Sequence, residues 1–143
     1  MDKENIPTIE DFAAISEDKI RYCDTDRQGH VNNSVFSSLL ETGRVEILYN
    51  PQNVLHGKNC SFVIASMKLD YLGEITWPGI IKIGTRISRI GKSSMDIQQG
   101  LFQDNQCVAL AETTIVQVNV ETKRSSILEN RTIETLKGYM KEK

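Results

Sequence analysis

The chain has 143 residues, of which 39% are hydrophobic, and its 17 basic side chains nearly balance its 19 acidic ones. This length suits one domain with a core of its own, so we expect a single domain over residues 1–143. The balanced charge, without a dense basic block, argues against nucleic acid as a partner. No apolar run approaches the ~20 residues of a membrane span, and the acidic start lacks the apolar core of a signal peptide. We therefore expect a cytoplasmic protein with no membrane partner.

The cysteines and histidines of the chain show no pattern typical of metal or disulfide chemistry. Cys23, Cys60 and Cys107 are odd in number and far apart, unlike a disulfide framework. They combine with His30 and His56 into no zinc-binding spacing. We therefore expect no metal site and no cofactor.

A polar arm, a strand and a long helix are predicted first in the chain. We expect the arm over residues 1–12 and the strand from about Ala14 to Cys23. The apolar spacing predicts a helix from about Asn33 to Tyr49, which Asn50-Pro51 stops. Gly43 stands on the apolar face of this helix, where a glycine costs ~1 kcal/mol against alanine. This cost predicts that Gly43 allows close approach to a sheet.

The rest of the chain has the apolar period of β-strands and ends in a short helix. After a loop over 52–60, the period-two pattern continues to residue 120. Turns at 77–79, 91–93 and 104–105 divide this stretch into four strands. We expect a short final helix from about Asn130 to Met140 within the C-terminal segment 129–143. One strand, one long helix and four antiparallel strands predict an α+β fold, with a meander wrapped around one helix.

A single curved sheet around one helix leaves edge strands and one sheet face uncovered. The predicted strands mix apolar and polar residues and are not polar enough to face water throughout. We therefore expect a homodimer.

Segment 24–33 holds the residues of the chain that are best suited to catalysis. It reads Asp-Thr-Asp-Arg-Gln-Gly-His-Val-Asn-Asn. Two aspartates one residue apart precede a turn that Gly29 allows, and the predicted helix begins directly afterwards. A helix start aims backbone N–H groups at the same small space as a carboxylate. We interpret the segment as a site that polarises a carbonyl.

The sequence of this segment resembles that of the hotdog-fold acyl-CoA thioesterases, in particular the branch of 4-hydroxybenzoyl-CoA thioesterase. Residues 24–31 fit that branch's Asp-x-Asp-x-x-Gly-x-x turn before a long helix. The run from His30 to Asn33, with Glu41, is also similar to the acyl-carrier-protein thioesterases of the same fold. The resemblance implies a curved antiparallel sheet wrapped around one central helix. It also implies a homodimer that pairs its sheets edge to edge around the substrate, and often a homotetramer.

The resemblance implies that Asp26 attacks the thioester carbonyl as a nucleophile or acts as general base for water. The sequence leaves these roles open, and an Asx-turn or helix-capping carboxylate is the structural alternative. The backbone N–H of Asn33 is expected to stabilise the oxyanion. The side chain of Asn32 or Asn33 is expected to cap the helix, and Asp24 to brace the turn.

His30 and Glu41 each have two interpretations. His30 either takes part in catalysis, by binding the carbonyl or moving a proton, or is fixed by hydrogen bonds of the turn. Glu41 either pairs with Arg44 on the same helix or projects toward Asp26 of the neighbouring subunit to orient water. Gln28 stands where the motif of the plant-type acyl-carrier-protein thioesterases has an asparagine.

The hairpin at residues 89–94 resembles the Arg-x-Gly-x-Ser-Ser hairpin of many hotdog thioesterases. The resemblance implies that Arg89 and Lys92 pair with CoA phosphates and that Ser93 binds a phosphate or amide. An ordinary solvated hairpin is the alternative.

The function predicted from these residues is hydrolysis of an acyl thioester to free acid and thiol, with CoA as part of the substrate. An acyl-carrier-protein thioester is the alternative substrate. A dehydratase or hydratase fits the turn poorly, because those enzymes pair a histidine with an acid at a different spacing. A non-catalytic module that binds acyl thioesters is the alternative of another class.

Overall fold

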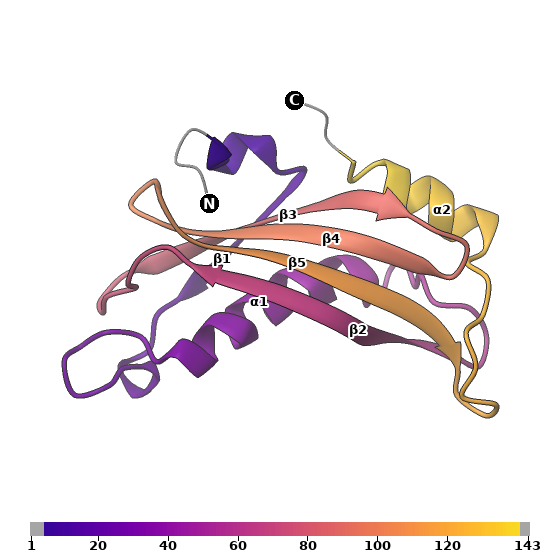
Figure 1. Ribbon diagram of the computed structural model, residues 1–143, viewed down its shortest axis with the longest axis horizontal. Coiled ribbons are helices and arrows are strands. Elements are labelled where there is room, and N and C mark those ends of the chain that lie inside the picture. The colour runs from indigo at the N-terminus through magenta and orange to yellow at the C-terminus, as the bar shows by residue number, and fades with distance from the viewer. Residues whose placement is uncertain (1–4, 141–143) are drawn as a thin grey trace.

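The computed structural model describes residues 5–140, and its elements follow the predicted order (Figure 1). Residues 1–4 of the predicted N-terminal arm and residues 141–143 of the predicted C-terminal segment lie outside the described residues. The strands are β1 (Ala14–Lys19), β2 (Cys60–Tyr71), β3 (Ile80–Ile90), β4 (Ser94–Gln103) and β5 (Gln106–Asn119). The helices are α1 (Asn33–Leu48) and α2 (Asn130–Lys137). Within residues 5–140, neither helix is long and apolar enough to cross a membrane.

All the strands form one antiparallel sheet in the order β1-β3-β4-β5-β2, so β1 and β2 are its edges. Helix α1 runs along one face of this sheet and packs mainly on β1, β3 and β4 (Figure 1). The sheet curves around the helix, and α2 lies at one end of the molecule. The predicted α+β hotdog arrangement is confirmed.

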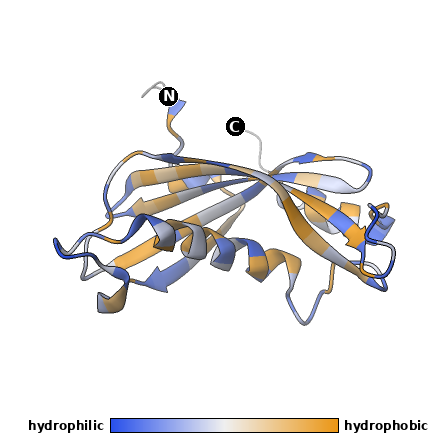
Figure 2. Ribbon diagram, turned by 60° about the horizontal axis from the view of Figure 1, so that its bottom comes forward, coloured by the Kyte–Doolittle hydropathy of each residue, from blue (hydrophilic) through white to orange (hydrophobic). Residues whose placement is uncertain are grey.

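The core lies between α1 and the sheet face that it covers. Buried residues alternate with more exposed ones along much of β3, β4 and β5, because successive strand side chains point to opposite faces, and Figure 2 shows apolar and polar residues mixed along the strands. On the covered face, Ile83, Ile97 and Leu101 are fully buried. At Gly43 a Cβ atom would lie 2.8 Å from side-chain atoms of Gln99, Ile83 and Thr85. The predicted close approach of the helix at Gly43 is therefore confirmed.

The first strand is shorter than predicted. It ends at Lys19 rather than near Cys23, because Lys19 pairs with Ile80, the first residue of β3, and no partner strand extends further. The chain then forms a 3₁₀ turn at Tyr22–Asp24. The predicted strand end near Cys23 is therefore wrong, and a compact turn leads to the two aspartates instead.

The N-terminal arm was predicted to be polar, but part of it is buried against the sheet. Ile9 and Phe12 are buried, and Phe12 packs against Phe102 on the sheet face opposite α1. A Cβ atom at Gly84 would lie 2.5 Å from the Phe12 ring, so this glycine makes room for it. The arm thus covers part of the outer sheet face.

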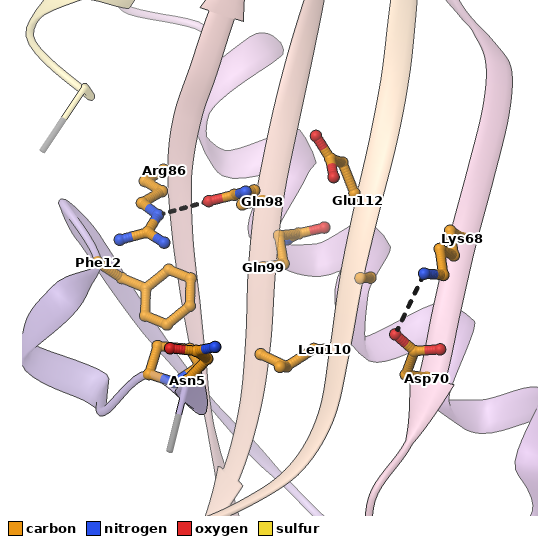
Figure 3. Close-up of a pocket in the computed structure, with 11 residues that line it drawn as sticks. Asn5, Phe12, Lys68, Asp70, Arg86, Gln98, Gln99, Leu110 and Glu112 are labelled. Atoms are coloured by element: carbon orange, nitrogen blue, oxygen red, sulfur yellow. Dashed lines mark hydrogen bonds and ion pairs between the residues drawn. The ribbon is translucent and has the colours of Figure 1, made fainter. Parts of the chain in front are cut away.

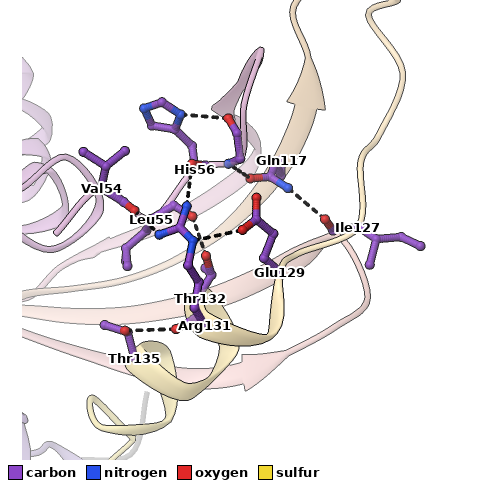
Figure 4. A network of polar contacts seen from close by, with 10 residues as sticks. Val54, Leu55, His56, Gln117, Ile127, Glu129, Arg131, Thr132 and Thr135 are labelled. Atoms are coloured by element: carbon purple, nitrogen blue, oxygen red, sulfur yellow. Dashed lines mark hydrogen bonds and ion pairs between the residues drawn. The ribbon is translucent and has the colours of Figure 1, made fainter.

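Helix α2 is fixed to the rest of the fold by a polar network (Figure 4). Thr132 Oγ1 donates to the Leu55 carbonyl at 2.5 Å, and the Arg131 guanidinium donates to the carbonyls of Val54 and His56. Gln117 on β5 joins the loop before β2 to the segment before α2. The helix ends at Lys137, so the predicted extension to Met140 is wrong.

Candidate active site

The turn that carries Asp26 is held by its own backbone. Asp26 N–H donates to the His30 carbonyl at 2.8 Å, and Gly29 adopts a φ of 79°. Asp26 Oδ1 accepts the backbone N–H groups of Gln28 at 2.8 Å and of His30 at 3.2 Å. This is the Asx turn that was the structural alternative for Asp26. Oδ2 accepts no bond from residues 5–140, so it stays available for chemistry.

Asp24 braces the start of the same turn, as predicted. Its carboxylate accepts the Arg21 N–H at 3.0 Å, and its carbonyl accepts the Asn32 N–H at 2.8 Å. These two bonds join the 3₁₀ turn to the residue that precedes α1. Asp26 is thereby positioned against the helix start.

The N-terminus of α1 is open. Asn32 is the N-cap residue, and its side chain makes no capping hydrogen bond, so the predicted capping is wrong for Asn32. The first N–H groups of a helix have no acceptor within the helix, and the helix dipole places positive charge there. The N–H of Asn33 is therefore free to donate to a ligand.

A cavity of about 400 Å³ joins the turn, the helix start and the end of β2. Asp26, His30 and Asn33 contribute to its wall, together with Phe36 and Tyr71. The Phe36 and Tyr71 rings meet edge to face, with centroids 5.0 Å apart. The cavity thus combines a carboxylate and helix N–H groups with an aromatic wall.

Glu74 is a site residue that the sequence analysis missed. It follows β2 and lines the same cavity, and its Oε2 lies 3.2 Å from His30 Nε2. His30 is also held through its backbone, since it pairs with Thr76 in an isolated bridge. No spacing signal joins positions 30 and 74, because a helix and a strand separate them and only the fold brings them together.

Glu41 does not join this cavity within one protomer. It is exposed on α1, two turns after the helix start, and does not line the cavity. The predicted surface pair with Arg44 is formed only in part. Arg44 is buried, which lowers its pKa, and it donates to Gln99 Oε1, while the nearby Glu41 carboxylate opposes that lowering without a close ion pair.

The comparison with protein families gives a match that spans this group of residues. The model of the thioesterase-like superfamily matches residues 20–135, which include the turn, α1 and every strand after it. The chain belongs to the thioesterase-like superfamily. Membership supports thioester hydrolysis as its general reaction.

Solved structures show the same fold for this thioesterase-like chain. The PA5185 protein from Pseudomonas aeruginosa is 22% identical, with a TM-score of 0.83 over 95% of this chain and 97% of that one. A thioesterase from Thermus thermophilus, solved with coenzyme A and Zn, is 25% identical, with a TM-score of 0.75 over 87% of this chain and 98% of that one. No curated protein matches the sequence.

The hairpin of the thioesterase-like chain lies far from the cavity in the same protomer. Tyr71 pairs with Ala109, whereas Ser94 pairs with Val116 further along β5. The distance along β5 is roughly 23 Å at ~3.3 Å per residue. The predicted CoA-binding residues Arg89, Lys92 and Ser93 are therefore not brought together with Asp26 in one chain.

Arg89 is also bound within its own hairpin. Its Nε and Nη2 donate to the two carboxylate oxygens of Asp96 at 2.8 and 3.2 Å. The hydrogen bond from Arg89 lowers the pKa of Asp96 below its usual range, and the pKa of Arg89 is raised in turn. A phosphate at this hairpin would have to compete with Asp96 for the guanidinium.

A second cavity, of about 280 Å³, lies on the sheet face opposite α1 (Figure 3). Three of its charged side chains contact other lining residues: Arg86 Nε donates to the Gln98 amide oxygen at 2.8 Å, and Lys68 lies 4.0 Å from Asp70. None of the predicted catalytic residues lines it. Residues 5–140 contain no group of three or more His, Cys, Asp or Glu side chains placed to hold a metal ion. The cavity at Asp26 is therefore the candidate active site.

Proposed function

We propose that this chain hydrolyses acyl-CoA thioesters, with Asp26 as the reacting carboxylate. One observation carries the proposal: Asp26, whose Oδ2 accepts no bond among residues 5–140, lines the same cavity as Asn33 at the uncapped N-terminus of α1. The family supports thioester hydrolysis in general. The coenzyme A found in the Thermus thermophilus thioesterase supports CoA as the carrier.

Two routes fit this geometry. As a base, Asp26 takes a proton from water while the water oxygen bonds to the carbonyl carbon. The carbonyl oxygen becomes an oxyanion, which the Asn33 N–H stabilises, and collapse breaks the C–S bond as the proton passes to the leaving thiolate. As a nucleophile, Oδ2 bonds to the carbonyl carbon and expels the thiolate, and water then cleaves the anhydride.

His30 and Glu74 complete the proposed site. Glu74 Oε2 lies 3.2 Å from His30 Nε2, where it can accept a hydrogen bond from the Nε2–H group; this bond fixes the ring orientation and leaves Nδ1 for the substrate. In this arrangement Glu74 is a positioning residue, and His30 contacts the carbonyl or carries the proton to the leaving thiolate. Such proton transfer contributes about 10²–10⁴-fold to rates in enzymes.

We further propose a homodimer that pairs two copies of β2. Strand β2 is a long, unpaired edge, with Val63 41% and Ile64 51% exposed. Antiparallel pairing sets the Cys60 end of one copy beside the Tyr71 end of the other, next to the cavity. The hairpin of the second copy then approaches the Asp26 cavity of the first, where Arg89, Lys92 and Ser93 can meet a CoA arm. Glu41, exposed on α1, is free to face the second copy.

The test is thiol release from short, long and aromatic acyl-CoAs by the native chain and by Asp26→Asn. Asparagine keeps the Oδ1 acceptor that the turn needs, so the fold should be unchanged while the basic oxygen is lost. We expect a loss of at least about a hundredfold in kcat for the variant, in line with the usual contribution of such groups.

Asp104→Asn is the matched control, because Asp104 lies in the exposed β4–β5 turn with a φ of 52°, which asparagine tolerates well. Its activity should equal that of the native chain. If Asp26→Asn keeps full activity, the assigned role of Asp26 is wrong. Thiol release only from acyl-carrier-protein esters would reassign the carrier, and release from neither would leave the binding module as the better proposal.

A further inference from the structure

Among the residues of 5–140 that line the cavity at Asp26, Tyr71 alone carries a hydroxyl group. It is the last residue of β2 and pairs with Ala109, which is fully buried in the apolar cluster that includes Leu40 of α1. Residues directly opposite in an antiparallel pair point to the same face, so the Tyr71 side chain points toward α1. Figure 1 shows this end of β2 and the start of α1 at the same end of the molecule. The cavity therefore holds a hydroxyl that neither proposed route uses.

The Tyr71 hydroxyl lies close to the backbone of Asn33, the residue whose N–H group is proposed to bind the oxyanion. Its Oη donates to the Asn33 carbonyl oxygen at 3.4 Å. In a helical residue the carbonyl oxygen stands ~3.5 Å from the nitrogen of the same residue, so Oη lies at most about 7 Å from the Asn33 nitrogen. Two donors that bind one oxygen at about 2.7–3.1 Å stand at most about 6 Å apart. A shift of roughly 1 Å therefore lets both groups bind the same oxygen.

The bond between this hydroxyl and the Asn33 carbonyl is weak. An O–H···O bond in proteins is usually about 2.5–3.0 Å long, so a separation of 3.4 Å marks a poor one. The carbonyl does not depend on this bond, because in an α-helix it accepts the N–H group of the residue four positions later. The hydroxyl can therefore turn to a better acceptor without leaving an unpaired group behind.

The ring of Tyr71, in contrast, is held on one side. It meets the Phe36 ring edge to face, with centroids 5.0 Å apart, and Phe36 is buried. Tyr71 itself is 51% exposed and lines the cavity, so the rest of its ring stays open. The hydroxyl is thus preorganised beside the helix start, and a small tilt of the ring is enough to redirect it toward developing charge.

We infer that Tyr71 is a further catalytic residue, whose hydroxyl donates a second hydrogen bond to the oxyanion that the Asn33 N–H binds. The inference rests on the proposed thioester hydrolysis at Asp26. As the carbonyl carbon gains its new C–O bond, the carbonyl oxygen becomes negative. The hydroxyl then leaves the Asn33 carbonyl for this oxygen and keeps its own proton. With two donors at the oxygen, His30 is left to carry the proton to the leaving thiolate.

The first experiment measures thiol release by the native chain and by Tyr71→Phe. Phenylalanine keeps the ring against Phe36 and removes only the hydroxyl, so the fold should be unchanged. Hydrogen bonds to an ionised acceptor are stronger than neutral ones, so the lost bond stabilised the transition state more than the bound ester. We therefore expect kcat to fall about a hundredfold, the usual cost of removing one oxyanion donor, while KM changes less than about threefold.

Tyr49→Phe is the matched control. The Tyr49 ring also meets a phenylalanine edge to face, at Phe62, and its hydroxyl also bonds to backbone groups, the N–H and carbonyl of Phe62. These groups lie near the opposite end of β2, and Tyr49 does not line the cavity. Its kcat should equal that of the native chain. An equal fall in both variants would indicate a structural effect of losing a hydroxyl and would overturn the inference.

A second measurement needs no turnover and separates this inference from the proposed function. Isotope-edited infrared spectra of an acyl-CoA bound to Asp26→Asn report hydrogen bonds to the thioester oxygen, because such bonds lower the carbonyl stretching frequency. Adding Tyr71→Phe should move the band toward that of the free ester, and adding Tyr49→Phe should not. A band that Tyr71→Phe leaves in place, or a folded Tyr71→Phe chain with native kcat, overturns the inference and leaves hydrolysis standing. A band that depends on Tyr71, although the native chain releases no thiol, would support the hydrogen bond while the proposed hydrolysis fails.

Discussion

The two carboxylate oxygens of Asp26 divide two tasks between them. Oδ1 accepts two backbone N–H groups and closes the turn, while Oδ2 has no partner among residues 5–140 and belongs to a residue that lines the cavity. The sequence set a structural Asx turn against a catalytic aspartate as alternatives. At the scale of single residues they are compatible, because the bonds that fix the turn also orient the oxygen available for chemistry.

His30 and Glu74 should act as one unit if Glu74 positions the ring. We expect kcat to fall about 100-fold in His30→Gln and about tenfold in Glu74→Gln, and the double variant to be no slower than His30→Gln alone. Thiol release by the three variants, with thermal melts to confirm folding, measures this. Losses that multiply in the double variant would show that the two residues act independently.

At the scale of elements, α1 connects the site to the core. Its open N-terminus faces the cavity, and its middle contacts the sheet closely at Gly43. A glycine there weakens the helix but allows the approach that buries Gln99 and its hydrogen bonds to the Leu40 carbonyl and Thr85 Oγ1. The position of the helix start, and with it the Asn33 N–H, depends on this contact.

Gly43→Ala should therefore destabilise the protein, although alanine is the better helix former. The added Cβ would lie 2.8 Å from Gln99, Ile83 and Thr85, whose side chains are packed and bonded. Overpacking of this kind costs about 1–3 kcal/mol, which exceeds the ~1 kcal/mol gained in helix propensity. Urea unfolding measures the difference. Ser38→Ala on the exposed side of α1 is the control, and an equal stability gain in both variants would contradict the close contact.

At the scale of the whole molecule, the two sheet edges differ. Strand β1 is short and carries Glu17, Asp18 and Lys19, charges that discourage pairing with another chain. Strand β2 is twice as long and exposes apolar side chains. The contrast favours β2 as the edge through which two copies pair, and such pairing would also complete the wall of the cavity. The homotetramer stays a prediction.

Val63→Lys should convert the proposed dimer into monomers, because pairing two antiparallel copies of β2 would bring like charges together. Light scattering coupled to size-exclusion chromatography gives the molecular mass in solution, and the rate of thiol release should fall when the dimer is lost. Ile15→Lys places the same charge on the other edge, where Ile15 is 53% exposed, and should leave the dimer unchanged. A native chain that is already monomeric, or a dimeric Val63→Lys variant, would exclude this interface.

The sequence predicted the elements well where their signals are local. Hydrophobic periodicity placed α1 and the four later strands, and Gly43 indicated the close contact, because each depends on residues near in the chain. The prediction failed where a distant partner decides: β1 stops where β3 begins, and Phe12 is buried by glycines on β3 and β4. Arg44 had the spacing of a surface pair, and only the packing of α1 on Gln99 buried it.

The sequence by itself determined the family, the fold class and the turn from Asp24 to Asn33, since these follow from the order of the predicted elements and from a local sequence motif. Only the tertiary structure placed Glu74 beside His30, separated Arg89 from Asp26 and showed which oxygen of Asp26 is free. The reason is that contacts between residues far apart in the chain depend on the register of the sheet and on how the helix packs against it. Those are properties of the whole fold, which no single segment specifies.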